Sequence, residues 1–161
     1  MTVQIRGYIL IAIFLILPSM CFSQDYDAKM TEYSEKFLAY SRVFVKFASL
    51  SVDNENEYNT ALVISGLAKD FHLHTSYIGD YLLILKIVNK HDEEKDLVGR
   101  LLRLRLESVI KDYDTAMERI KQTTKNVENE SIKATADDLK KDLTALRKDL
   151  EEIKSKYQNR G

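Results

Sequence analysis

The chain has 161 residues, with 24 Lys and Arg against 25 Asp and Glu and a formal net charge of −1 at pH 7. This balance excludes a global basic field that would recruit nucleic acid. The single Cys excludes an intrachain disulfide scaffold, a zinc ribbon and an iron–sulfur cluster, and the length is that of one ordinary domain.

The N-terminal residues have the pattern of a secretory signal. Arg6 is followed by the apolar run GYILIAIFLILP and then by SMCFSQ, which has small residues at Cys21 and Ser23. The run is too short for a comfortable membrane span of about 20 residues. We therefore expect residues 1–23 to be a cleaved signal peptide, with residues 24–161 forming one exported domain, periplasmic or secreted, that has no transmembrane segment. The alternative is a lipid anchor at Cys21, although Met20 stands where lipoprotein signals usually have a small side chain.

Three polar stretches, SVDNENE, NKHDEEK and NVENES, divide the remaining chain into four segments. The first segment predicts a helix over residues 25–50, because its apolar side chains recur in alternating steps of four and three and so share one face. Six of these seven side chains are aromatic. The seven residues of this face are Tyr26, Met30, Tyr33, Phe37, Tyr40, Phe44 and Phe47.

The second segment predicts a helix over residues 55–90. Asn54 followed by Glu57 is a capping-box pattern at its start. Gly66 and Gly79 each cost about 1 kcal/mol inside a helix, which indicates a close helix approach or a kink. The expected core face is Ile64, Leu67, Phe71, His74, Ile78, Tyr81, Leu85 and Val88.

The third and fourth segments predict helices over residues 93–126 and 131–158, with Leu102, Leu106 and Val109 beginning the first core face and Leu143, Leu146 and Leu150 at the centre of the second. Continuing the third helix without a turn would bring Glu130 and Asp137 onto the core face, so the chain must turn near Asn129. On the fourth helix, the pairs Asp138 with Lys141 and Glu151 with Lys154, and Asp149 beside Lys148, indicate a solvated face of weak ion pairs.

Four long amphipathic segments with short connections predict an all-α fold, an up-down-up-down antiparallel four-helix bundle. The alternative is a pair of coiled-coil hairpins that complete their core only as a dimer. The side chains expected to be nearly inaccessible are Phe37, Phe44, Phe71, Leu85, Leu106, Leu143, Leu146 and Leu150.

The stretch KDFHLHTSYIGDYLLIL places His72 and His74 close together in sequence, but about 200° apart around a helix, so they cannot bind one ion together. No Glu-x-x-His pair, glycine elbow or phosphate-binding loop is present. We therefore predict no metal, no cofactor and no enzymatic activity, with His74 a packed residue. The alternative is a b-type haem held by Met30 and His74, which lie at about the same height on two core faces.

Helix lengths predict that the second and third helices overhang the other two as a hairpin tip over residues 83–100. Both arms of this overhang are apolar on nearly every side. Such helical segments are usually covered, either by a partner or by neighbouring chain ends. Lys90 and His91 join Arg100 and Arg103 in a positive rim, which suits an acidic partner or anionic lipid. The candidate interaction surface is Leu83, Ile87, Val88, Leu97, Val98, Leu101, Arg100 and Arg103.

These patterns together favour an exported, non-enzymatic helical interaction module of the cell envelope or extracellular space, such as an adaptor, a chaperone or a secretion-apparatus subunit. We expect it to bind a protein partner or a second copy, with membrane-surface contact as a further option and no nucleic acid.

Overall fold

The computed structural model describes residues 25–88 and 92–158. The predicted signal peptide and Cys21 lie outside this part of the chain, as do Lys90 and His91. Four helices make up the described residues, which contain no strand: α2 (Tyr26–Leu50), α3 (Glu55–Ile87), α4 (Asp92–Thr124) and α5 (Glu130–Gln158). These bounds follow the predicted ones closely, except that α3 ends at Ile87 instead of residue 90.

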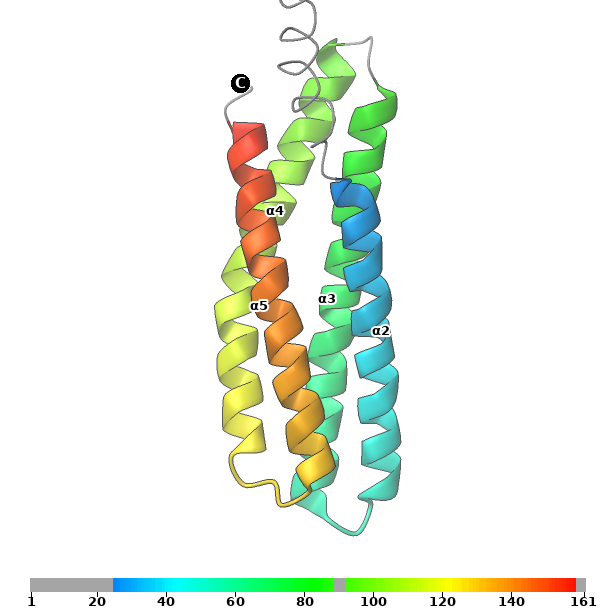
Figure 1. Cartoon of the computed structure of the whole chain (residues 1–161), viewed down its shortest axis with the longest axis vertical. Coiled ribbons are helices and arrows are strands. Elements are labelled where there is room, and N and C mark those ends of the chain that lie inside the picture. The colour runs from blue at the N-terminus through cyan, green and yellow to red at the C-terminus, as the bar shows by residue number, and fades with distance from the viewer. Residues whose placement is uncertain (1–24, 89–91, 159–161) are drawn as a thin grey trace, which may run out of the picture.

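Successive helices run in opposite directions and pack into one bundle (Figure 1). Each helix packs against the next along the chain, and α5 returns to pack against α2. The loops from α2 to α3 and from α4 to α5 lie at one end, and the last residues of α3 and the first residues of α4 lie at the other. The predicted four-helix bundle is confirmed, and its core closes within one chain instead of requiring paired hairpins from two copies.

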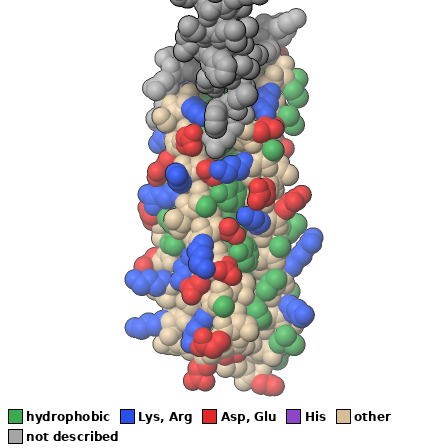
Figure 2. All heavy atoms as spheres, in the orientation of Figure 1, with side chains coloured by type: hydrophobic (Ala, Val, Ile, Leu, Met, Phe, Trp, Pro, Cys, Tyr) green, Lys and Arg blue, Asp and Glu red, His purple; other side chains and the backbone are tan. Residues whose placement is uncertain are grey.

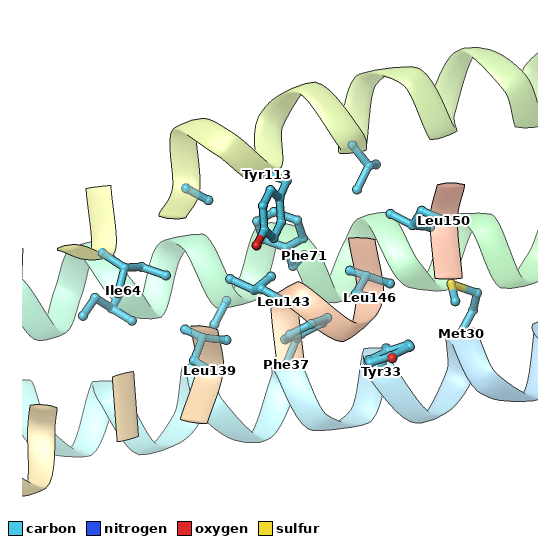
Figure 3. Packing of buried hydrophobic residues seen from close by; sticks show 14 of the residues in the cluster. Met30, Tyr33, Phe37, Ile64, Phe71, Tyr113, Leu139, Leu143, Leu146 and Leu150 are labelled. Carbon is cyan, nitrogen blue, oxygen red and sulfur yellow. The ribbon is translucent and has the colours of Figure 1, made fainter. Parts of the chain in front are cut away.

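Aromatic and leucine side chains from all four helices fill the core (Figure 3). The Phe37 ring is fully buried between Tyr33 and Phe71, with ring centroids 6.0 and 5.9 Å away. Every residue predicted to be inaccessible is buried except Leu85, which is only half-buried. Leu85 lies near the end of α3, where the bundle has fewer helices to cover it.

Small side chains line the contact between α2 and α3, which is the most extensive helix contact in the bundle. Ser41 Oγ lies 3.1 Å from Ser65 Oγ, and a Cβ placed on Gly79 would lie 3.4 Å from the Met30 Cβ. Ala61, Ser65, Ala68, Thr75 and Gly79 are therefore the buried residues of α3 on this side. The predicted α3 face was partly wrong, because Leu67, His74, Tyr81 and Val88 are only half-buried.

The two glycines of α3 predict opposite mutational effects. A methyl group placed on the Gly66 Cα would have no neighbouring atom within 4 Å, whereas one on Gly79 would already touch Met30 and the Asp27 carbonyl oxygen. We expect Gly66→Leu to raise the free energy of unfolding by about 0.5 to 1 kcal/mol through better helix propensity. Gly79→Leu should lower it by about 1 to 3 kcal/mol, because the side chain must push α2 away. Urea unfolding of both variants checks this, and equal effects would show that α2 and α3 do not pack closely at Gly79.

Tyrosines of α2 bond to carboxylates of α5 in a regular series between the two antiparallel helices. The tyrosines recur every seven residues, and their acceptors lie three and then seven residues apart on α5, so the three pairs meet at nearly matching heights and fix the register of α5 against α2. Burial, and then the hydrogen bond to an aspartate, raise the pKa of Tyr33 and Tyr40 well above the ordinary value, which keeps both as neutral donors. The pairs are Tyr26 with Glu152 at 2.7 Å, Tyr33 with Asp149 at 2.7 Å and Tyr40 with Asp142 at 2.9 Å.

Glu57 joins the two loops at one end of the bundle. Asn54 caps α3 by accepting a hydrogen bond from the Glu57 backbone N–H, which is one half of the predicted capping box. The buried Glu57 carboxylate accepts bonds from Ser51 Oγ at 3.3 Å and from the Asn129 N–H at 3.1 Å. The carboxylate thus connects the loop before α3 to the loop before α5.

Candidate functional site

The α3–α4 hairpin extends past both neighbouring helices (Figure 1). A Cβ on Gly79 would lie 3.6 Å from the Asp27 carbonyl oxygen near the start of α2, and the long Lys86 side chain reaches back to pair with Asp25 and Asp27. The last residues of α3 therefore have no α2 beside them. On the other side, Lys154 lies 3.7 Å from Glu107, and α5 ends four residues later. About ten residues of α4 therefore project past α5, roughly 15 Å at 1.5 Å per residue. We call residues 83–88 and 92–104 the hairpin tip.

Large apolar side chains of the hairpin tip are exposed to solvent. Ile87 is 71% exposed and Leu97 52% exposed, while Leu83 and Leu101 are also exposed and Val88 and Val98 are half-buried. Leu104, outside the predicted surface, is 65% exposed. Exposed leucines and isoleucines this close together are unusual on a monomer and are typical of an interaction surface.

The rim of the tip carries both signs of charge, and the predicted positive rim was incomplete. Arg100 is exposed and Arg103 is half-buried, but Glu93, Glu94 and Asp96 are exposed beside them. Glu93, Glu94, Asp96, Leu97 and Arg100 together line a shallow open depression. The prediction counted only the cations of this segment, and the acidic residues at the start of α4 make the rim dipolar.

The charged side chains at the rim of the hairpin tip differ in ion pairing from many of those on the body of the bundle. Figure 2 shows one face of the bundle, where Lys and Arg side chains alternate with Asp and Glu along its length. Many acidic and basic side chains of the bundle form ion pairs, such as Lys141 with Asp138 at 2.9 Å. Within residues 25–88 and 92–158, no ion pair involves the acidic and basic side chains named at the rim.

The two neighbouring histidines of α3 point to different helices. His72 Nδ1 lies 2.8 Å from Ser34 Oγ on α2, whereas His74 Nδ1 lies 3.4 Å from Arg105 Nη1 on α4. Met30, the other residue of the haem alternative, is fully buried against Gly79. The structure thus places Met30 and His74 against different neighbours. The described residues also contain no group of three His, Cys, Asp or Glu side chains that could hold a metal ion.

His74 gives the bundle a predicted pH dependence. Burial, and then the nearby Arg105 guanidinium, lower the pKa of His74 below its ordinary value of 6.5, although Asp112 and Asp70 act in the opposite direction. As the pH falls through 6.5, the unfolded chain therefore binds a proton at this site before the folded chain does, and the free energy of unfolding decreases. Above that pH the histidine is neutral in both states and this loss is absent.

We expect His74→Gln to weaken the decrease in stability between about pH 7.5 and pH 5.5. The measurement is the urea midpoint of wild type and variant at the two pH values. Both proteins contain His72, so any contribution of His72 cancels in the comparison. An equal decrease in wild type and variant would contradict the pKa shift of His74.

None of the described helices combines the length and apolar character needed to cross a membrane. Comparisons with protein-family models, curated proteins and solved structures found no match to the chain. The hairpin tip is therefore the feature of the molecule that bears on its function.

Proposed function

We propose that the chain is an exported, non-enzymatic helical interaction module that binds a protein partner through its hairpin tip. The main support for this proposal is the solvent exposure of Ile87, Leu97 and Leu101 on an overhang that neither α2 nor α5 reaches. An adaptor, chaperone or secretion-apparatus subunit acts by contact alone, and a rigid bundle with a projecting apolar end suits such a role.

Rigid elements on both arms of the tip support this proposal. α3 and α4 continue as regular helices beyond the rest of the bundle, so their exposed side chains are held in place before any partner binds. Preorganised apolar side chains lose little conformational freedom on binding, which favours affinity. Buried apolar anchors surrounded by charged residues are the usual composition of a protein interface.

The binding experiment compares crosslinked adducts of three proteins in the envelope fraction. The tip variant carries Leu83→Gln, Ile87→Gln and Leu101→Gln. The control variant carries Val45→Gln, Leu50→Gln and Val52→Gln, which lie on α2 and its following loop and are also exposed. We expect the tip variant to lose the adducts that wild type and the control form. Equal adducts in all three proteins would contradict binding through the tip.

Export has a separate test. The proposed cleavage after Ser23 predicts that protein recovered outside the cytoplasm begins at Gln24. N-terminal sequencing of that protein measures the site directly. Recovery of the chain only in the cytoplasm, beginning at Met1, would contradict the export part of the proposal.

A further inference from the structure

We infer that the partner of the hairpin tip is a second copy of this chain, paired antiparallel along the outer face of α4. This inference rests on the proposed function and names the partner for the same surface. It is carried by the order of charges along α4 and by the leucines beside them.

The leucines of the tip form one stripe on α4. Leu97, Leu101 and Leu104 follow one another in steps of four and three, so they share a face of the helix, and all three are exposed. Arg105 lies over the Tyr77 ring of α3 at 5.0 Å, which places α3 on one side of this stripe. Tyr77 is exposed too and extends the apolar surface on that side.

Charged residues lie along the opposite side of the leucine stripe in a fixed order. At about 100° per residue, Glu93, Asp96, Arg100 and Arg103 fall on the side of α4 away from α3. The two acids come first and the two arginines follow about seven residues later, so this side of the helix is negative at one end and positive at the other.

The same four charges have no ion pair among the described residues, although acids further along α4 do pair within the chain. Glu107 lies 3.7 Å from Lys154 of α5, and Asp114 also pairs with an α5 cation, Arg147. Glu93, Asp96 and Arg100 lie beyond the end of α5, and Arg103 lies level with that end, so none of them pairs with an α5 side chain in this way. Apart from neighbours four residues apart on α4 itself, such as Asp96 and Arg100, their pairing partners would come from outside the described residues or from water.

Two identical helices in antiparallel contact satisfy this charge pattern through one two-fold axis. Such a contact is self-complementary, and like sides of the two helices face each other across it. We place the two-fold axis at the level of Val98. Leu97 of one copy then lies about 3 Å, measured along the helix axis, from both Leu97 and Leu101 of the second copy. The leucines can then interdigitate.

The same register matches the charges. Glu93 of one copy then lies level with Arg103 of the other, and Asp96 lies level with Arg100, with both contacts repeated by symmetry. This arrangement forms an end-to-end dimer in which only the hairpin tips overlap. An anionic lipid surface fits less well, because the exposed Glu93 and Asp96 would be repelled by it.

Charge reversal tests the pairing by sedimentation equilibrium at low ionic strength. The basic variant carries Glu93→Lys and Asp96→Lys, and the acidic variant carries Arg100→Glu and Arg103→Glu. We expect wild type to form a dimer, each variant alone to lose at least tenfold in dimer affinity, and an equal mixture of the two to regain a 1:1 heterodimer. A control with Asp138→Lys and Lys141→Asp reverses an exposed pair on α5 and should remain dimeric.

Three outcomes would overturn the antiparallel dimer without contradicting an interaction through the hairpin tip. Wild type that stays monomeric but forms adducts lost in the tip variant would show a different protein partner. A dimer unaffected by either charge reversal would exclude this antiparallel register. Binding to vesicles of anionic lipid, lost in the acidic variant, with no dimer formed, would assign the tip to a membrane surface. If wild type is monomeric and the tip variant also retains every adduct, the proposed function fails as well.

Discussion

Replacing Leu146 with Ala is expected to lower the free energy of unfolding by about 2 to 5 kcal/mol. Leu146 is 1% exposed and lies at the centre of the core, between Leu143 and Leu150 on the buried face of α5 (Figure 3). The substitution removes buried apolar surface and leaves a cavity that rigid neighbouring helices cannot fill.

Leu104→Ala is the matched control, because it removes the same atoms from a side chain that is 65% exposed. Its effect should stay within about 0.5 kcal/mol. Urea denaturation followed by circular dichroism measures both values. A loss below about 0.5 kcal/mol for Leu146→Ala would indicate that α5 is only loosely attached to the other helices.

Asp149→Ala is expected to cost about 1 to 3 kcal/mol. The carboxylate is largely buried, accepting a hydrogen bond from Lys29 Nζ at 2.8 Å and another from the Tyr33 hydroxyl at 2.7 Å. Removing it leaves the buried Tyr33 hydroxyl without its acceptor, and an unsatisfied buried donor costs more than the hydrogen bond itself contributed.

The double variant Asp149→Leu with Tyr33→Phe separates these two effects. Replacing both polar partners by apolar groups should restore most of the stability lost in Asp149→Ala, because no buried donor then lacks an acceptor. Asp138→Ala on the exposed face of α5 is the control, and we expect a change within about 0.5 kcal/mol. If Asp149→Ala is equally mild, the bond to Tyr33 contributes little to holding α2 against α5.

The four helices could be predicted because their apolar spacing has one dominant solution. On α2, large aromatic side chains recur on a single face, and most of that face is buried as expected. On α3 the same reasoning failed in part, because apolar residues occur around much of the helix and size decides which side meets α2. Gly79, Ser65 and Ala68 are buried there since only small side chains allow the helices to approach closely.

Buried charges were the second feature that sequence patterns did not reveal. Asp149 lies next to Lys148 in a segment of alternating charges, which is typical of a solvated face. It is buried because α2 presents Tyr33 and Lys29 at the same height, and that height depends on how the helices align in three dimensions. The burial of Glu57 has the same origin, since its hydrogen-bond donors come from two different loops.

The hairpin tip could be predicted from helix lengths alone, because short turns fix how far each helix reaches along its neighbour. The sign of its rim could not be obtained from the cations alone. Glu93, Glu94 and Asp96 begin α4, where acids are favoured by the helix dipole, and they also face solvent at the tip. Their presence beside Arg100 changes the expected partner from an acidic surface to one that carries both charges.

Thermal unfolding of the tip variant, which carries Leu83→Gln, Ile87→Gln and Leu101→Gln, tests most directly whether the hairpin tip is surface or core. The melting temperature is measured at a protein concentration where wild type sediments as a monomer, so that lost association does not contribute. We predict a melting temperature within about 2 °C of wild type, because these side chains are exposed and lie outside the buried core. A decrease as large as that of Leu146→Ala would contradict an interaction surface at the tip and assign these side chains to the core of the bundle.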